Sequence, residues 1–194
     1  DFYGRDSWLR NKIDTQGLVF IADIPCNIGV WLECPKTGVP PRKTSVRGRN
    51  PTREKVLEGD DPIKVKDLKD QLEDMQWHRV FIRDTERKEL WADMTCLRVF
   101  PSEENSLPGR ECWLIIRKDP CGKEIKYQLS NAPADIDMNR LGQMSGSRFW
   151  IERAFEDGKG IAGLADYQVR SWTGWHHHMT MTFLAMLYLM TLSM

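Results

Sequence analysis

The sequence lacks an excess of either charge, a pairing pattern among its cysteines and a long hydrophobic run. Its 28 lysines and arginines balance 28 aspartates and glutamates, so a site for a polyanion must come from local clustering and not from the overall field of the protein. The five cysteines are odd in number and form no Cys-x-x-Cys pair. They argue against a zinc knuckle or a disulfide framework and favour a reducing, intracellular setting.

The longest apolar run, Met179 to Met194, has 16 residues and includes three threonines and a serine. It is too short to cross a bilayer comfortably, so we expect a buried helix there and no membrane partner. The sequence also shows no signal peptide, internal repeat or low-complexity tract. What remains is a chain of 194 residues, 41% hydrophobic and 29% charged, which is the composition of a globular protein with a packed core.

Three parts can be separated along the chain, and the first covers residues 1–34. The apolar spacing from Gly4 to Asp14 predicts a helix, which Gly17 ends. The unbroken apolar run from Leu18 to Ala22 then predicts a buried strand, and a second extended piece follows from Gly29 to Glu33. A helix followed by a buried strand indicates an α/β protein.

The second part, residues 35–134, opens with a basic loop from Lys36 to Lys55. The loop holds seven lysines and arginines against the single acid Glu54, a net charge of +6, and its prolines exclude regular structure. Such a loop could track a phosphate backbone, with an affinity that falls as the salt concentration rises. The alternative is a solvated loop without a partner. The candidate DNA contacts in the loop are Arg42, Lys43, Arg47 and Arg49.

The rest of the second part predicts one helix and a β meander. The helix, from Ile63 to Met75, has an apolar stripe of Val65, Leu68 and Leu72. Turns rich in Asp, Thr, Pro and Gly separate the strand-like pieces, as in an antiparallel meander. These pieces are Val80–Arg83, Glu89–Asp93, Cys96–Phe100, Cys112–Lys118 and Glu124–Leu129. The third part, residues 135–194, has a helical pattern to its end.

The most informative segment runs from Ser145 to Gly160. At 100° per residue, Glu152 lies about 40° and Lys159 about 20° from Arg148 around a helix, so the three side chains form a row on one face. The plain interpretation is a solvated face with an i,i+4 ion pair between Arg148 and Glu152. Apolar residues occupy the opposite face, namely Trp150, Ile151, Ala154 and Phe155.

A functional interpretation of the row follows from the chemistry of phosphodiester transfer. A carboxylate between two cations can hold Mg²⁺ while arginine and lysine clamp the phosphates. Glu152 would need a second acid for this purpose. Asp1, in a turn before the first helix, and Asp23, at the end of the first strand, are both candidates.

The row belongs to a longer pattern. Arg148, Glu152 and Lys159 have the spacing R-x3-E-x6-K, and residues 163–172 (GLADYQVRSW) and 174–179 (GWHHHM) follow. Together these stretches resemble the C-terminal part of DDE transposases from bacterial insertion sequences, the class with a Tyr-Arg-Glu-Lys signature. The similarity extends to three earlier segments, residues 1–5 (DFYGR), 20–25 (FIADIP) and 130–133 (SNAP).

The resemblance implies an α/β fold with a partial RNase H-like core, interrupted by a mostly antiparallel β insertion. Residues 1–34 and the helical residues 135–194 would form this core, and residues 35–134 would form the insertion. The implied activity is metal-dependent cleavage and strand transfer at the ends of an insertion element. The implied partner is double-stranded DNA, both transposon ends and target, on which a homodimer assembles in the bacterial cytoplasm at the nucleoid.

The family's site residues carry over to four positions of this sequence. Asp1 and Glu152 match the ligands of Mg²⁺ or Mn²⁺, so the resemblance implies that both are catalytic. Arg148 and Lys159 match the residues that hold the transposon end. Asp23 would then be a structural acid at the end of its strand.

The chain departs from the family signature in two places. Ser145 stands where the signature has a tyrosine, so a phenol contact to the DNA terminus is missing or comes from elsewhere. The family's first catalytic aspartate lies upstream of the second, at which this chain begins, so we expect a fragment that lacks part of the site. Two alternatives stay open: a non-catalytic DNA-binding remnant of a transposase, and an RNase H-like nuclease that hydrolyses DNA without joining it.

The C-terminal stretch also holds consecutive histidines and two tryptophans. His176, His177 and His178 cannot converge on one ion from a helix, because adjacent residues point about 100° apart, so we assign them packing or DNA-facing roles and no zinc. Trp172 and Trp175 could stack on an unpaired base at a cleaved DNA end. The alternative is that both lie in the core. We take Trp172 as a candidate DNA contact.

Overall fold

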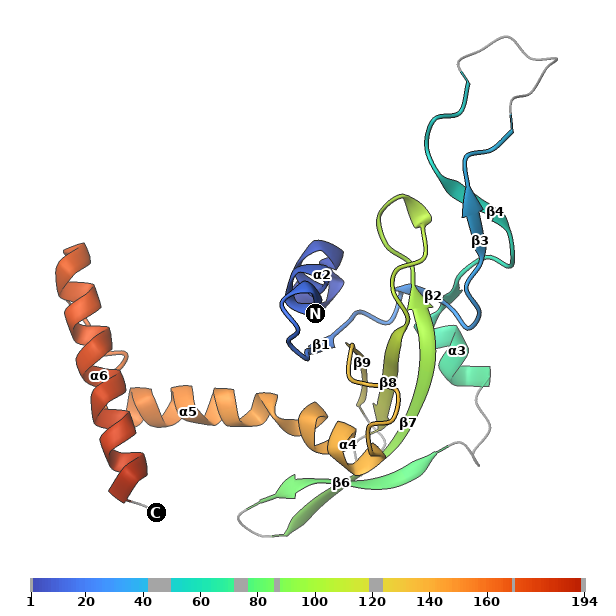
Figure 1. Ribbon diagram of the computed structural model, residues 1–194. Helices are drawn as coiled ribbons and strands as arrows, with labels where there is room; N and C mark the ends of the chain where they lie inside the picture. Colours follow the sequence, from blue (N-terminus) through green and yellow to red (C-terminus); the bar gives the residue numbers. More distant parts are fainter. Residues whose placement is uncertain are drawn as a thin grey trace. The chain divides into compact units, whose positions relative to one another are not determined.

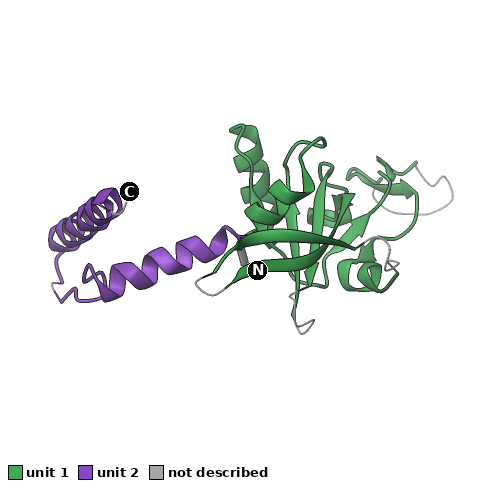
Figure 2. Ribbon diagram, turned by 90° about the horizontal axis from the view of Figure 1, so that it is seen from below, with its two compact units in different colours: residues 1–145 green, residues 146–194 purple. Residues whose placement is uncertain are grey.

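The computed structural model describes residues 2–41, 50–71, 77–85, 88–118, 124–168 and 170–192. The chain divides into two compact units, the first spanning Asp1–Ser145 and the second Gly146–Met194 (Figure 2). Within the described ranges, the first unit holds an antiparallel sheet with short helices, and the second holds two longer helices (Figure 1). The protein is therefore of mixed α and β structure.

The helices and strands follow one another in this order along the chain. Up to the boundary between the units the described elements are α1 (Phe2–Arg5), α2 (Ser7–Thr15), β1 (Ile21–Asp23), β2 (Gly29–Trp31), β3 (Lys36–Gly38), β4 (Lys55–Glu58), β5 (Ile63–Lys64), α3 (Val65–Gln71), β6 (His78–Asp84), β7 (Glu89–Pro101), the 3-10 helix η2 (Glu104–Ser106), β8 (Cys112–Lys118), β9 (Ile125–Ser130) and α4 (Met138–Gly146). The second unit contains α5 (Arg148–Gly160) and α6 (Trp172–Leu192).

The main sheet of the first unit is antiparallel throughout. Among the described residues its strand order is β1-β9-β8-β7-β2-β5, and β6 also pairs with β7 (Figure 1). Strands β6, β7, β8 and β9 are consecutive along the chain and adjacent in the sheet. The predicted antiparallel meander is therefore confirmed.

One predicted turn within the meander is wrong. The sequence pattern separates the strands Glu89–Asp93 and Cys96–Phe100, whereas the structure has the single strand β7 of 13 residues. Met94 and Thr95, between the two predicted pieces, are buried and continue the ladder, opposite Arg117 and Ile116 of β8. Hydrogen bonding to a neighbouring strand thus overrides the weak turn signal.

The first strand also differs from its prediction. The apolar run was expected to be buried from Leu18, but β1 begins at Ile21 and its residues are half-buried. Leu18 and Val19 are 56% and 51% exposed. The reason is the position of β1 at the edge of the sheet, where it pairs with β9.

The basic loop is more regular at its ends than its prolines suggest. Lys36–Gly38 (β3) pairs with Lys55–Glu58 (β4) in a small antiparallel sheet, so the prediction that regular structure is excluded from Lys36 to Lys55 is wrong at both ends. The Lys36 ammonium lies 2.6 Å from the Glu58 carboxylate. Residues 42–49, between the two strands, lie outside the described residues.

The core of the first unit lies on both faces of the sheet. Along β8, Leu114 and Ile116 belong to one hydrophobic cluster and Ile115 belongs to the other, because successive side chains of a strand point to opposite faces. The first cluster includes Val65 and Leu68 of α3, the two described members of the predicted apolar stripe. The predicted helix begins two residues later than Ile63, which is in β5.

The second unit leaves much apolar surface exposed. The large apolar side chains of α6 that are between 42% and 66% exposed are Met181, Phe183, Leu184, Leu187, Tyr188, Leu189, Met190 and Leu192. Within this unit the expectation of a buried helix is wrong, because one neighbouring helix cannot cover a helix that is apolar on all sides. Among the described helices, none is both long enough and apolar enough to cross a membrane.

Candidate functional site

Helix α5 carries the charged row that the sequence predicts. The Nε atom of Arg148 lies 2.9 Å from Oε1 of Glu152, and the two side chains are 65% and 59% exposed. Lys159 is exposed on the last turn of the same helix, about 16 Å along the axis from Arg148 at 1.5 Å per residue. The structure thus brings the three residues onto one helix, in a row long enough to contact more than one phosphate of a DNA strand.

A second ion pair on α5 has the same spacing. Nε of Arg153 lies 3.2 Å from Oδ1 of Asp157, on a side of the helix about 140° from Arg148. Exposed i,i+4 pairs of this kind stabilise a helix by about 0.3–0.5 kcal/mol. The predicted ion pair between Arg148 and Glu152 is confirmed, and the role of the row in metal and DNA binding stays a prediction.

The predicted apolar face of α5 is exposed as well. Trp150, Ile151 and Phe155 are 57%, 59% and 49% exposed. Near its end, α5 packs against α6, where a Cβ added to Gly158 would lie 2.9 Å from the Met186 sulfur. Because both faces of α5 are open within the second unit, exposure of the charged row does not by itself distinguish a functional face from a solvated one.

Several predicted site residues lie outside the described residues, namely Asp1, Arg42, Lys43, Arg47 and Arg49. The sharing of one ion by Asp1 and Glu152 therefore stays a prediction, as does the contact of the basic loop with DNA. In the part of the chain that the structure describes, no group of three or more His, Cys, Asp or Glu side chains is arranged to hold a metal ion.

The segment just after Asp1 packs on the end of strand β1. A Cβ added to Gly4 would lie 1.9 Å from the carbonyl oxygen of Asp23, so glycine is required for this close approach. Nη1 of the buried Arg10 donates a hydrogen bond to the Gly4 carbonyl at 2.5 Å and joins α1 to α2. Gly4, three residues after Asp1, is thereby held at the carboxyl end of β1.

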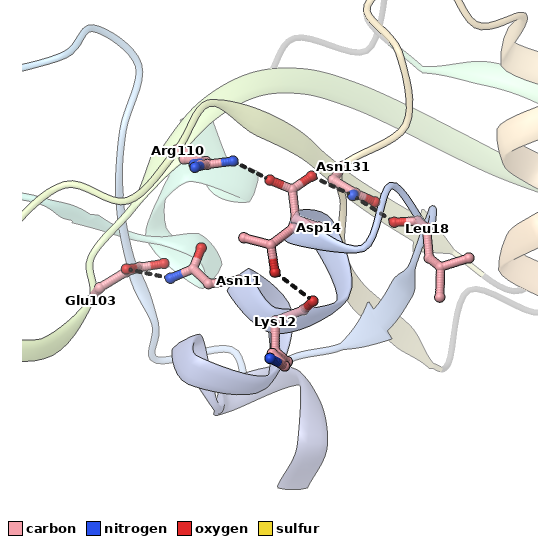
Figure 3. A network of polar contacts seen from close by, with 8 residues as sticks. Asn11, Lys12, Asp14, Leu18, Glu103, Arg110 and Asn131 are labelled. Carbon is pink, nitrogen blue, oxygen red and sulfur yellow. Dashed lines mark hydrogen bonds and ion pairs between the residues drawn. The ribbon is translucent and has the colours of Figure 1, made fainter.

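A polar network holds α2 against the sheet, with Asp14 and Asn131 at its centre (Figure 3). Asp14 accepts hydrogen bonds from Asn131 at 2.7 Å and from Arg110 at 2.5 Å. The pKa of Asp14 lies below its ordinary value, mainly because of the hydrogen bond from Asn131. The hydrogen bond and the positive charge of Arg110 lower it further. Asn131 also bonds the backbone of Leu18 and Phe20. Sequence reasoning missed this role, although Asn131 belongs to the SNAP segment.

A second polar chain joins β1, β9, β8 and the end of α4. Nε2 of Gln128 donates to Asp23 at 2.7 Å, and Oε1 of Gln128 accepts from the Ser145 hydroxyl at 2.6 Å. The same hydroxyl accepts from Nη1 of the buried Arg117 at 2.9 Å. Asp23 thus has a structural partner, as expected of a strand-end acid. Ser145, which stands where the family signature has a tyrosine, is 4% exposed. Its hydroxyl therefore bonds other residues of the protein and does not face the solvent.

Trp172 and Trp175 lie at the surface of the second unit. Their rings stack with centroids 5.4 Å apart and planes 16° from parallel, and Trp172 is 73% exposed while Trp175 is 38% exposed. The alternative that places both tryptophans in the core is therefore wrong within this unit. Trp172 is the first residue of α6.

Two of the three consecutive histidines have packing contacts in the structure. The His176 ring lies edge-on to Trp172, with centroids 4.3 Å apart. Nε2 of His178 lies 3.1 Å from the Gly163 carbonyl, and its ring contacts the ring of Tyr167. For His176 and His178 these contacts agree with the first of the two predicted roles, packing or facing DNA.

The described cysteines in the sheet are not suited to act as nucleophiles. Burial raises the pKa of the thiols of Cys96 and Cys112 to about 12. Both are therefore protonated at neutral pH, and a thiolate is the reactive form.

No family model, curated protein or solved structure matches the chain. The case for a function therefore rests on the residues: the row of Arg148, Glu152 and Lys159, the segments that resemble DDE transposases, and the contacts that the structure shows around them.

Proposed function

We propose that the protein is the C-terminal catalytic part of a DDE transposase, which cleaves DNA at the ends of an insertion element and joins it to a target. The observation that carries the proposal is the row of Arg148, Glu152 and Lys159 on the exposed face of α5. The resemblance of the flanking sequence to this family adds to it. The alternative is a solvated helix, and the substitution described below separates the two.

Glu152 has the chemistry of a ligand for a divalent cation. Its carboxylate oxygens are the donors that Mg²⁺ and Mn²⁺ prefer, and at 59% exposed it is accessible to an ion. In the proposal Asp1 supplies a second carboxylate. Bound there, Mg²⁺ would activate water, and later a DNA 3′-hydroxyl, for in-line attack on a phosphodiester.

The two cations of the row would hold the DNA strand. A guanidinium presents five N–H donors in a planar fork, so Arg148 can contact Glu152 through Nε and still be oriented toward a phosphate. Lys159 adds a point charge at the other end of the row. Together they would hold the phosphates of the transposon end and offset the charge that develops during transfer.

The partner in this proposal is double-stranded DNA, bound by a homodimer that assembles on paired transposon ends in the bacterial cytoplasm. The loop residues Arg42, Lys43, Arg47 and Arg49 would add phosphate contacts, and Trp172 would contact an end. One observation favours the alternative of a non-catalytic DNA-binding remnant. Ser145 is buried and bonded to Arg117 and Gln128, so it cannot replace the contact of the signature tyrosine.

The substitution E152Q, made in the full-length protein, tests the proposal because it removes the carboxylate charge and keeps the shape of the side chain. We expect Mg²⁺-dependent nicking of supercoiled DNA that carries the element ends to fall by a factor of about a hundred or more. DNA affinity in a gel-shift assay should stay nearly unchanged. Strand-transfer products in the wild-type reaction would exclude a nuclease that only hydrolyses.

The matched control is D157N, which breaks the other i,i+4 ion pair of the same helix. D157N removes one ion pair from α5, as E152Q does, but leaves Glu152 intact. If the row is catalytic, D157N should therefore nick DNA at the wild-type rate. Equal nicking by wild-type protein and E152Q would refute the catalytic role. Equal loss in E152Q and D157N would assign the effect to helix stability.

A further inference from the structure

A surface pocket opens where the segment before α6 meets the first turn of that helix. Its volume is about 560 Å³. All the residues that line it belong to the second unit, so it does not depend on the placement of the two units. They are Tyr167, Gln168, Arg170, Ser171, Trp172 and Trp175.

The aromatic wall of the pocket is a supported platform. The Trp172 ring stacks on Trp175, with planes 16° from parallel, and meets the edge of His176 at 4.3 Å between centroids. Trp172 is nevertheless 73% exposed. A ring that is held in place by two neighbours and open over most of its surface can accept a further flat ring by stacking.

Hydrogen bonds hold the segment that forms the rest of the pocket. The Tyr167 hydroxyl donates to the Ser171 carbonyl at 2.8 Å, and the Ser171 hydroxyl accepts from the Gly174 amide at 3.1 Å. Nε2 of His178 contacts the Gly163 carbonyl at 3.1 Å. Binding to side chains that are already held by hydrogen bonds costs less conformational entropy than binding to loose ones.

The polar residues of the pocket indicate the kind of ligand. Arg170 is exposed, and within the described part of the chain it makes no hydrogen bond or ion pair. Gln168 is exposed and carries an amide that can both donate and accept. A flat aromatic platform, a cation and an amide within one pocket match the three parts of a nucleotide: base face, phosphate and base edge.

We infer that this pocket binds an unpaired base of single-stranded DNA. The base stacks on Trp172, Arg170 contacts an adjacent phosphate, and Gln168 faces the edge of the base. The inference rests on the proposed function for the choice of DNA as ligand. Its residues and its binding step are separate from Glu152 and need no metal ion.

The test measures binding of a labelled thymidine hexamer by fluorescence anisotropy in EDTA. We expect W172A to weaken binding about fivefold to a hundredfold, the range for loss of one base–aromatic stack. The matched control W150A removes another exposed tryptophan, 57% exposed on α5, and should stay within about twofold of wild type. W172F keeps a ring and should retain most of the affinity.

A second ligand separates stacking from charge. An abasic hexamer has the same phosphates and no bases, so it should bind the wild-type protein as weakly as the thymidine hexamer binds W172A. R170A should reduce the slope of log affinity against log salt by about 0.7, the value for one phosphate contact on a single strand. R170K, which keeps the charge, should preserve the slope.

Two results would overturn the inference: unchanged affinity in W172A, or equal affinity of the abasic and thymidine hexamers for the wild-type protein. Failure of the proposed function is recognised separately. E152Q should bind the hexamer as the wild type does, because the assay contains no divalent metal. If W172A weakens binding of the hexamer but the wild-type protein does not nick DNA, only the catalytic proposal is refuted. If the wild-type protein nicks DNA but W172A binds the hexamer as tightly as wild type, only the pocket is refuted.

Discussion

Gly4 approaches the backbone of Asp23 so closely that a Cβ on Gly4 would lie 1.9 Å from the Asp23 carbonyl oxygen. This contact seats the segment that follows Asp1 on the carboxyl end of β1. Gly4 belongs to the stretch of sequence, residues 1–5, that resembles DDE transposases. A packing requirement of the first unit thus explains the glycine in that stretch.

We predict that G4A destabilises the first unit. The methyl group meets a backbone carbonyl, which cannot move aside as a flexible side chain can, so helix α1 must shift away from β1. We expect a loss of about 1–3 kcal/mol in the free energy of unfolding, as is typical of overpacking. Urea denaturation followed by circular dichroism measures it.

The control for this prediction is G160A, at the end of α5, where an added Cβ meets no atom within 4 Å. It should leave stability unchanged or raise it by up to about 1 kcal/mol, since alanine favours a helix over glycine. A G4A protein as stable as wild type would show that α1 does not pack on β1 in solution.

We predict that S145A also destabilises the first unit. The substitution leaves Nη1 of Arg117 and Oε1 of Gln128 without the hydroxyl that joins them. An unsatisfied buried polar group costs about 1–3 kcal/mol, and this loss should appear as a lower urea midpoint. N139A, at an exposed position of the same helix α4, should change the midpoint little. Equal midpoints for S145A and wild type would contradict the hydrogen-bonded role of Ser145.

The third stability prediction concerns pH and Asp14. Because its hydrogen bonds lower the pKa of Asp14 in the folded state, the charged carboxylate stabilises the fold fully above the unfolded pKa of about 4. That contribution is lost as the pH falls through the lower, folded pKa. Wild type should therefore be more stable than D14N at pH 7, and the difference should shrink toward pH 3.

The exposed Asp135 provides the comparison for Asp14. D135N should differ little from wild type at either pH, when the midpoints of urea unfolding are measured in the same buffers. If D14N and wild type differ in unfolding midpoint by the same amount at pH 7 and at pH 3, the negative charge of Asp14 does not stabilise the fold.

Local sequence patterns predicted the strands of the meander well. Cys112–Lys118 was expected as a strand and has the bounds of β8, because a short apolar run between turn signals depends only on nearby positions. The Arg148–Glu152 ion pair was predicted for the same reason, since residues four apart on a helix are neighbours whatever surrounds them. The predicted metal site includes Asp1, which lies outside the described residues, so it stays a prediction.

Features that depend on distant partners were not predicted. Asn131 contacts Asp14 across 117 positions of the chain, and no local pattern marks that contact. The buried hydroxyl of Ser145 likewise acquires its role from Arg117 and Gln128, on strands β8 and β9.

The sequence alone determined strands such as β8 and which residues share the charged face of α5, because these properties depend on nearby positions and on the helical period of 3.6 residues. Tertiary structure decided the rest. It merged two predicted strands into β7 through pairing with its neighbours, left Trp172 and the apolar side chains of α6 exposed, and buried Ser145. Burial and pairing depend on which surfaces meet, and segments far apart in the chain supply those surfaces.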